Sequence, residues 1–421
     1  MPSTLVHDFE TPWVSSDPAR LACALDPVAA AGEHSLRLTA AAGAGGAMAT
    51  FTPGTPSDLT PYDELRFWLY ADQAADGSTT RPFLLELGYE DAADAAGEQH
   101  RWLVPVGRSR AWEQHRIGLA AERRSSVTRW LLRCHTDRPF RALVDDLLAV
   151  TENPLADVEV ALIELLGAPV ALPGVTRVPV RPAAVGATAL TVDRNLRFRK
   201  GNQIVVEGGA SPGVLGRHAV TGVSHDEAAG TTTLAVEPAT AVAIGSGATV
   251  SVTVPVVVEE APHVPPADRP DLPDPVLLLA LTDQREEPER AWNIPQRDSF
   301  RAEGDRTVCS IRPAARPVLL EYQVLAAATD RDQSLTIRAA VLGRVGVDTG
   351  LRVNGTVLPV RTLLPPPLTE RDRAVLAPVF LHVGTRVELG ARREVPWVRH
   401  GEIRAAPLST PDDQEGIVLR L

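Results

Sequence analysis

The sequence predicts a multidomain protein that is built mainly of β-strands. At about 100–200 residues per domain, its 421 residues predict two to four domains. The 36 prolines and 31 glycines exclude long helices and coiled coils, but they suit short strands that are joined by turns. Runs in which apolar and polar residues alternate, such as residues 35–39, recur along the chain as they do in half-buried strands.

The composition excludes several classes of protein. A net charge of −11 argues against a dedicated nucleic-acid-binding protein and against a basic protein of the membrane surface. No run approaches the roughly 18 apolar residues of a membrane span, and residues 1–10 lack the basic and apolar regions of a secretory signal. The three cysteines are far apart and odd in number, so we expect no disulfide framework and a chain that folds in the cytosol.

The first segment, residues 1–152, has the pattern of a β-sandwich. Its strand-like runs are rich in aromatic residues, and turn residues separate them. The last of these runs covers residues 144–150. Trp68 and Trp130 lie within runs of alternating apolar residues, so we expect both side chains in the core of the sandwich.

Three shorter segments follow the sandwich. Residues 153–174 are a helix and connector, because apolar residues recur at helical spacing over residues 157–166 before a glycine and a proline. Residues 175–258 return to about five short strands that glycines punctuate, which predicts a small β-barrel module. Residues 259–275 are rich in proline and are expected to form an extended linker.

The last segment, residues 276–421, is predicted to be an α+β domain in which a helix packs on an antiparallel sheet. Asp330 is a candidate N-cap for a helix that ends at Arg344. Asn354-Gly355 suits the type I′ turn of a β-hairpin. The apolar face of the expected helix consists of Leu335, Ala339 and Leu342. The expected strands are residues 276–281, 318–326, 351–360 (as the hairpin), 379–383 and 395–399.

A search for catalytic motifs does not indicate an enzyme. The sequence has no dinucleotide-binding or phosphate-binding glycine motif, no nucleophile elbow and no zinc-protease motif. Its ten histidines are scattered singly. Asp145 and Asp146 are neighbours on one expected strand, so they face opposite sides and cannot act as a carboxylate pair.

Carboxylates on the first and last strands of the sandwich are a candidate metal site. Asp8 and Glu10 lie on the first strand, and Asp145 or Asp146 lies on the last. The terminal strands of a sandwich are often neighbours, so these oxygens could gather around Ca²⁺. The alternative is that they are solvated charges that protect an edge strand. No other cofactor is expected.

Tryptophans of the sandwich are the candidates for a binding surface. Aromatic faces stack on sugar rings, but large aromatic side chains also fill the cores of sandwiches. Trp13 and Trp112 lie near expected loops, so they are the better candidates for contact with a carbohydrate.

Residues 1–152 resemble jelly-roll carbohydrate-binding modules. The resemblance lies in an acidic first strand (Asp8-Phe9-Glu10), in "SLRL" at 35–38, in "DLTPYDELRFW" at 58–68 and in the final Asp145-Asp146 strand. In such modules the terminal carboxylates often hold a structural calcium, which implies the same role for Asp8, Glu10 and Asp145.

The rest of the chain resembles structural proteins of phage tails. The "ATALTV" and "TTLAV" strands of residues 175–258 are similar to a small β-module of tail and surface proteins. From residue 276 onward, the order of a strand, a loop at 297–300, "LLEYQVLAA", a helix and "LRVNGTVLPV" is similar to tail-ring proteins encoded beside contractile injection systems of actinobacteria. The resemblance implies no catalytic residue.

These resemblances lead to two expected functions. The first is a structural subunit of a contractile phage-tail-like injection particle, near the baseplate or cap, that assembles through residues 276–421. Its partners would be other tail, baseplate or cap subunits and further copies in a homo-oligomeric ring. The alternative is a carbohydrate-binding or cell-surface adhesion protein that acts through the sandwich. Oligomeric state distinguishes them, because ring subunits bury large complementary surfaces.

Overall fold

The structure of the protein is a computed structural model. It describes residues 3–78, 80–95, 98–119, 123–208, 213–259, 272–287, 289, 296–303, 306–346, 349–363, 378–388, 392–396, 402–405 and 417–420. The fold is mainly β, as predicted, with several sheets and two helices in this part of the chain. No helix there is long and apolar enough to cross a membrane.

The N-terminal residues form the predicted sandwich. One sheet has the order β3 (Leu21–Asp26), β4 (Ser35–Ala40), β11 (Phe140–Val150), β6 (Glu64–Ala71) and β9 (Trp112–Gly118), and β1 (Ser3–His7) also pairs with β11. The facing sheet begins with β2 (Val14–Ser15), β5 (Met48–Phe51), β10 (Val127–Cys134), β7 (Leu85–Asp91) and β8 (His100–Leu103).

Trp68 and Trp130, which were both expected in the core, differ in how far their side chains are buried. Trp130 is fully buried, as predicted, and its ring lies 5.5 Å from that of Tyr89. The prediction for Trp68 is wrong, because its side chain is only partly buried. Side chains alternate along a strand, so the inward position of Phe67 places Trp68 on the outer face of the sheet.

Strands from the C-terminal third continue the second sheet of the sandwich. After β8 the sheet runs through β20 (Gln296–Glu303), β21 (Arg306–Arg312) and β26 (Arg393–Pro396). Phe300 pairs with Leu103, and its ring lies 4.9 Å from that of Phe83. The loop expected at residues 297–300 is therefore wrong, since these residues belong to β20. The segment boundaries remain predictions, but residues 276–421 contribute strands to more than one sheet.

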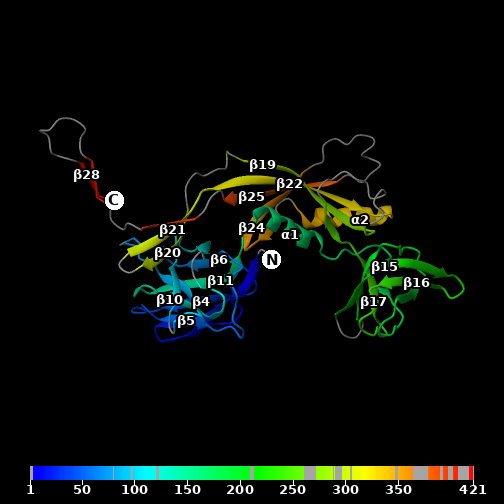
Figure 1. Cartoon of the computed structure of the whole chain (residues 1–421), viewed down its shortest axis with the longest axis horizontal. Helices are drawn as coiled ribbons and strands as arrows, with labels where there is room; N and C mark the ends of the chain where they lie inside the picture. The colour runs from blue at the N-terminus through cyan, green and yellow to red at the C-terminus, as the bar shows by residue number, and fades with distance from the viewer. Residues whose placement is uncertain are drawn as a thin grey trace.

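The second large sheet lies above the sandwich in Figure 1. Its order is β18 (Val256–Val258), β19 (Val276–Glu286), β22 (Ala315–Ala327), β25 (Val379–Glu388), β24 (Thr356–Leu363) and β23 (Thr349–Val353). Helices α1 (Pro154–Leu166) and α2 (Arg331–Arg344) share one hydrophobic core with it. Asn153 caps α1 by accepting a hydrogen bond from the N–H of Ala156, and Pro154 begins the helix.

Helix α2 has the predicted N-cap, Asp330, but its buried face differs from the expected one. Leu335, Ala339 and Leu342 are exposed, with Leu335 and Leu342 at 43% and 44%. Ile337 and Val341 face the sheet instead. They lie four residues apart and so form a separate stripe that is compatible with helical spacing.

Residues 178–253 form the small barrel that was predicted for residues 175–258, while residues 256–258 are β18 of the C-terminal sheet. The six strands of the barrel run in the order β12 (Val178–Pro179), β17 (Thr249–Thr253), β14 (Gln203–Glu207), β15 (Val214–Asp226), β16 (Thr231–Glu237) and β13 (Ala189–Asp193). A bridge between Val180 and Val192 joins the two ends of this sheet. Most of the expected linker, residues 260–271, lies outside the described residues, as do residues 397–399 of the last expected strand. A final pair, β27 (Glu402–Ala405) and β28 (Ile417–Arg420), forms a two-stranded sheet.

Candidate binding site between the sandwich and the C-terminal sheet

The outer face of the first sandwich sheet carries a ladder of large polar and aromatic side chains. Leu65, Phe67 and Leu69 of β6 are buried in the core, so the residues between them point outward. The rings of Tyr70 and Trp112 lie 5.8 Å apart, and both residues are half-buried. The pairs across β6 and β9 are Arg66 with Arg116, Trp68 with Gln114 and Tyr70 with Trp112.

The hairpin formed by β23 and β24 docks on the middle of this ladder. The indole N–H of Trp68 donates a hydrogen bond to the carbonyl of Gly355 at 3.1 Å. The hydroxyl of Thr356 donates to Oε1 of Gln114 at 2.7 Å. Arg352 pairs with Asp146 at 3.2 Å. These contacts join residues that are far apart in the sequence.

The tip of the hairpin has the predicted turn. Asn354 and Gly355 have φ angles of 47° and 75°, as a type I′ turn requires. A Cβ atom on residue 355 would lie 3.0 Å from Cδ1 of Leu148 and 3.1 Å from Nε2 of Gln114. Glycine is therefore needed here both for the backbone conformation and for the close approach to the sandwich.

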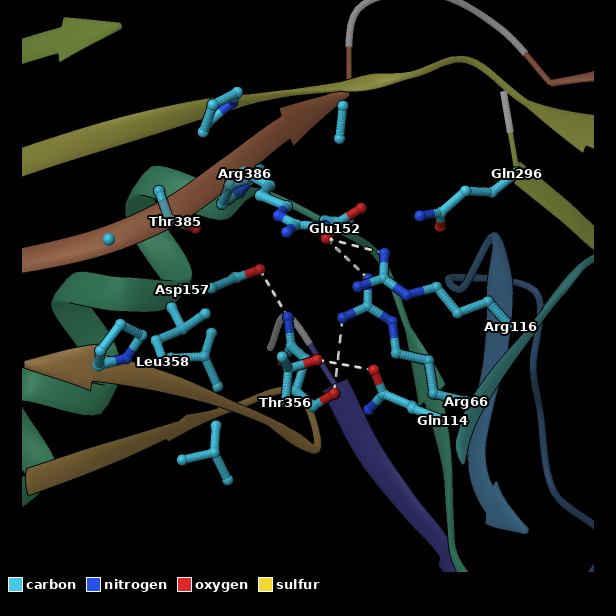
Figure 2. Close-up of a pocket in the computed structure, with 18 of the residues that line it drawn as sticks. Arg66, Gln114, Arg116, Glu152, Asp157, Gln296, Thr356, Leu358, Thr385 and Arg386 are labelled. Carbon is cyan, nitrogen blue, oxygen red and sulfur yellow. Dashed lines mark hydrogen bonds and ion pairs between the residues drawn. The ribbon is translucent and has the colours of Figure 1, made fainter. Parts of the chain in front are cut away.

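A cavity of about 700 Å³ lies beside the hairpin, between the sandwich and the C-terminal sheet (Figure 2). Its wall is mostly polar, and many of its side chains are guanidinium, amide or carboxylate groups. These are Arg66, Gln114, Arg116, Glu152, Asp157, Glu289, Gln296, Arg312, Asn354 and Arg386.

Arg66 is the centre of a buried ion network at this cavity. Its side chain is 2% exposed and pairs with Glu64 and, at 2.8 Å, with Glu152. Burial alone would lower the pKa of Arg66, but these carboxylates outweigh it and raise the pKa. Burial would likewise raise the pKa of Glu64, but Arg66 and Arg392 lower it. Both groups are therefore charged in the folded protein.

Further guanidinium groups extend the network. Arg116 lies 3.4 Å from Glu152, and burial together with Arg66 and Arg312 lowers its pKa. Arg312 pairs with Asp298 at 3.2 Å and donates to Oε1 of Gln296 at 2.6 Å. Arg392 contacts Glu64 and Asp298.

Asp157, at the start of α1, closes another side of the cavity. Its Oδ2 accepts hydrogen bonds from the N–H of Asn153 at 3.0 Å and from the amide of Asn354 at 2.7 Å. Its Oδ1 is buried without a hydrogen-bond partner. Burial raises the pKa of this carboxyl group.

The two tryptophans that were predicted to contact a ligand have different positions. The prediction for Trp13 is wrong. Its side chain is 3% exposed, its ring stacks on Phe9 at 5.3 Å, and its indole N–H donates to His7 at 3.3 Å. Nearness to a loop did not expose it, because the residues around it are aromatic and pack together. Trp112 lies at the end of the outer ladder, and its contact with a sugar stays a prediction.

The carboxylates that were predicted to bind calcium do not form a shared site. Oε1 of Glu10 accepts hydrogen bonds from the N–H groups of Glu33 and His34, at 2.6 and 3.1 Å. Asp8 is exposed and accepts from the N–H of Glu10. Among the described residues there is no group of three or more His, Cys, Asp or Glu side chains that could hold a metal ion.

Asp145 accepts hydrogen bonds from other residues than Glu10 does. It is fully buried, and its Oδ2 accepts from the N–H groups of Ala30 and Ala31 at 2.7 and 2.8 Å. Burial raises its pKa to about 6. A Ca²⁺ ion needs six to eight oxygen ligands. Oε1 of Glu10 and Oδ2 of Asp145 instead accept hydrogen bonds from backbone N–H groups of different residues, so these carboxylates do not gather around one ion. Glu10 and Asp145 instead hold the loop of residues 28–34.

Sequence reasoning missed most residues of the cavity. Arg66, Gln114, Arg312 and Asn354 come from segments that are far apart in the chain. The one local signal was the alternation in Leu65–Leu69, which places Arg66 and Trp68 on the outer face once the core positions are assigned.

Comparisons with known proteins give a likeness to carbohydrate-binding modules over about a third of the chain. No family model and no curated protein matches the sequence. A family 11 carbohydrate-binding module from a cellulosomal cellulase of Clostridium thermocellum is 9% identical, covers 36% of this chain and 95% of its own, and has a TM-score of 0.28. A family 30 module from another cellulase of that organism is 17% identical, covers 36% of this chain and 100% of its own, and has a TM-score of 0.30. Nothing in these comparisons indicates a phage-tail-like particle.

Proposed function

We propose that this protein binds carbohydrate on the outer face of the first sandwich sheet. The observation that carries the proposal is the partly exposed pair of Tyr70 and Trp112, whose rings lie 5.8 Å apart at one end of the outer ladder. Aromatic rings stack on the apolar faces of sugars. The proposed role is binding without a catalytic step.

Binding to soluble polysaccharides tests this proposal. One of the similar structures holds a β-1,3-1,4-linked tetrasaccharide, so a mixed-linked β-glucan is the first ligand to test. In affinity electrophoresis, Trp112→Ala should weaken binding at least tenfold, while Trp112→Phe should retain most of it. Val14→Ala, at a 72% exposed position on the other sheet, is the control. Equal binding by Trp112→Ala and the wild type would refute the site.

A second candidate function, assembly into a larger particle, is supported by one observation on helix α2. Leu335, Ala339 and Leu342 form an exposed apolar stripe on α2, which a neighbouring subunit would cover. This supports the proposal of a structural subunit of a contractile phage-tail-like particle near its baseplate or cap. In particles purified from cells, Leu335→Asp with Leu342→Asp should remove the subunit, while Val160→Asp, at an exposed position on α1, should not. Incorporation of the double variant would exclude assembly through this helix.

A further inference from the structure

We infer that the hairpin of β23 and β24 limits the proposed sugar site to a short platform, so that the protein binds a mono- or disaccharide unit and gains no further contact from a longer glycan chain. This inference rests on the proposed function, because it concerns the same aromatic pair, Tyr70 and Trp112. It adds the class of ligand that the pair accepts. The observation that carries it is the position of the hairpin tip over the next pair of the ladder, Trp68 and Gln114.

The hairpin tip, residues 354–356, closes the pair of Trp68 and Gln114 to a ligand. The carbonyl of Gly355 already accepts the indole N–H of Trp68. The hydroxyl of Thr356 donates to Oε1 of Gln114 (Figure 2), and Nε2 of the same amide is buried. The polar atoms that could hold a sugar hydroxyl group at this pair are therefore covered, and a sugar ring above them would collide with the tip.

The barrier continues from β6 onto β11. Asp145, which pairs with Trp68 across these strands, is fully buried. The loop of residues 28–34 covers it, because backbone N–H groups of that loop donate to its Oδ2 at 2.7 and 2.8 Å. The guanidinium of Arg352 in the hairpin donates to the carbonyl of Ala30 in the loop at 3.0 Å. Hairpin and loop thus form one wall across the strands, and a glycan chain stacked on the aromatic pair cannot extend along the strands past it.

The platform is also short on its other sides. Strand β6 ends at Ala71 and β9 begins at Trp112, so Tyr70 and Trp112 are the last pair of the ladder. Neighbouring pairs on one face are about 7 Å apart along the strands. Leu143, the partner of Tyr70 on β11, is 2% exposed and offers no further stacking surface. The aromatic surface that remains is two rings with centroids 5.8 Å apart, which about two sugar units can cover.

The wall is anchored at the hairpin tip itself. The side-chain amide of Asn354 donates to Oδ2 of Asp157 on α1 at 2.7 Å. Gly355 has the φ of 75° that the turn requires, and its backbone lies close to Leu148. A ligand would have to break these contacts to displace the tip. Sugars beyond the second unit therefore meet no aromatic ring, and they add little to the free energy of binding.

The first test is the dependence of affinity on chain length. Calorimetry of the full chain compares cellobiose, a mixed-linked β-glucan tetrasaccharide and a mixed-linked hexasaccharide. The dissociation constants should agree within about fivefold, which is the statistical gain from the larger number of sugar pairs in a longer chain. A steeper rise of affinity from the disaccharide to the hexasaccharide would overturn the inference.

The second test removes the wall. Gly355→Ala places a methyl group against Leu148 and Gln114, which should lift the tip and open the pair of Trp68 and Gln114. The variant should bind the tetrasaccharide about tenfold more tightly than the wild type does, and the disaccharide equally. Adding Trp68→Ala should remove this gain, because the uncovered indole supplies it. Gly43→Ala, which also has a positive φ but open space around it, is the control and should bind like the wild type.

The outcomes separate this inference from the proposed function. Absence of binding to every oligosaccharide, or equal binding by Trp112→Ala and the wild type, would refute the proposed function. A steep rise of affinity with chain length in the wild type, with Trp112→Ala still defective, would overturn only the inference. An unchanged dependence on chain length in Gly355→Ala, in spite of a red shift of fluorescence that reports an uncovered Trp68, would overturn it as well.

Discussion

The sandwich and the central barrel both attach to the C-terminal sheet, but the contacts that attach them differ. The barrel is joined through apolar side chains, since one hydrophobic core runs from α1 through Leu172 and Val254 into the barrel. The sandwich has a core of its own. It is joined by the hydrogen bonds of the hairpin tip to Trp68 and Gln114, by the ion pair of Arg352 with Asp146, and by the pairing of β20 with β8.

This difference explains why a polar cavity lies beside the sandwich. Apolar side chains can pack wherever their shapes fill the space, so an apolar junction can be filled tightly. Guanidinium and carboxylate groups must meet with fixed geometry and keep part of their hydration. The polar junction is therefore less tightly filled, and it retains a space in which a ligand can contact charged groups.

The largest expected effect comes from the polar junction. Arg66→Met should lower the free energy of unfolding by about 3–5 kcal/mol, because it leaves Glu64 as a buried anion with fewer partners and removes a partner of the partly buried Glu152. Urea denaturation followed by tryptophan fluorescence measures this loss. Arg361→Met, on an exposed part of β24, should change little. A loss below about 1 kcal/mol for Arg66→Met would mean that the network does not hold the junction.

The apolar junction should respond to a cavity in its core. Leu162 of α1 is fully buried there, so Leu162→Ala should cost about 3 kcal/mol. Unlike the loss for Arg66→Met, this loss should not vary with salt concentration. Val160→Ala on the exposed side of α1 is the control and should not destabilise the protein, because alanine has the higher helix propensity; a similar loss in that variant would contradict the assignment of the loss to the buried core.

Within the sandwich, two buried groups should give opposite dependences of stability on pH. Burial raises the pKa of Asp145 to about 6, so the folded protein holds this proton more tightly than the unfolded chain does. The stability contributed by Asp145 is therefore highest below pH 4 and falls by about 3 kcal/mol as the pH rises through 6. Burial lowers the pKa of His115 to about 4, so its contribution rises by a similar amount between pH 4 and 6.5.

Single variants separate these two contributions. Asp145→Asn should leave a protein whose stability rises steeply from pH 4 to 6.5. His115→Gln should leave one whose stability falls over the same interval. Denaturation at a series of pH values measures both curves. Parallel curves for the two variants would contradict the assignment of these protons.

The smallest expected effect is at the tip of the hairpin. Gly355→Ala should cost about 1–2 kcal/mol, because the residue has a positive φ and its Cβ would press on Leu148 and Gln114. The indole of Trp68 would then become more exposed, which a red shift of fluorescence would report. Gly43→Ala also has a positive φ but has open space around it, so it isolates the steric part of the effect.

The sequence predicted what local patterns determine and missed what depends on distant contacts. Alternation located the strands of the sandwich and the burial of Trp130, and the Asn-Gly pair located the hairpin turn. The same alternation did not say which face of β6 is the core, so Trp68 was misplaced. Helix α2 has two apolar stripes, one with Leu335 and Leu342 and one with Ile337 and Val341. Only packing against the sheet determines that the second stripe is buried. Two partners of Arg66, Glu152 and the carbonyl of Asn354, come from distant segments, so no local pattern predicts the cavity.

The continuation of the sandwich sheet into β20 has a consequence for the order of synthesis. Strand β8 can pair with β7 when the sandwich folds. Its other edge stays unpaired until β20, which contains Phe300, has been synthesised. The sandwich is complete once β11 ends at Val150, and at about 5–20 residues per second Phe300 leaves the ribosome on the order of 8–30 s later. During that interval the nascent sandwich presents an open edge, which favours pairing with a neighbouring nascent chain. His100 and Arg101 lie on this edge strand, and their polar side chains oppose such pairing until the chain supplies its own β20.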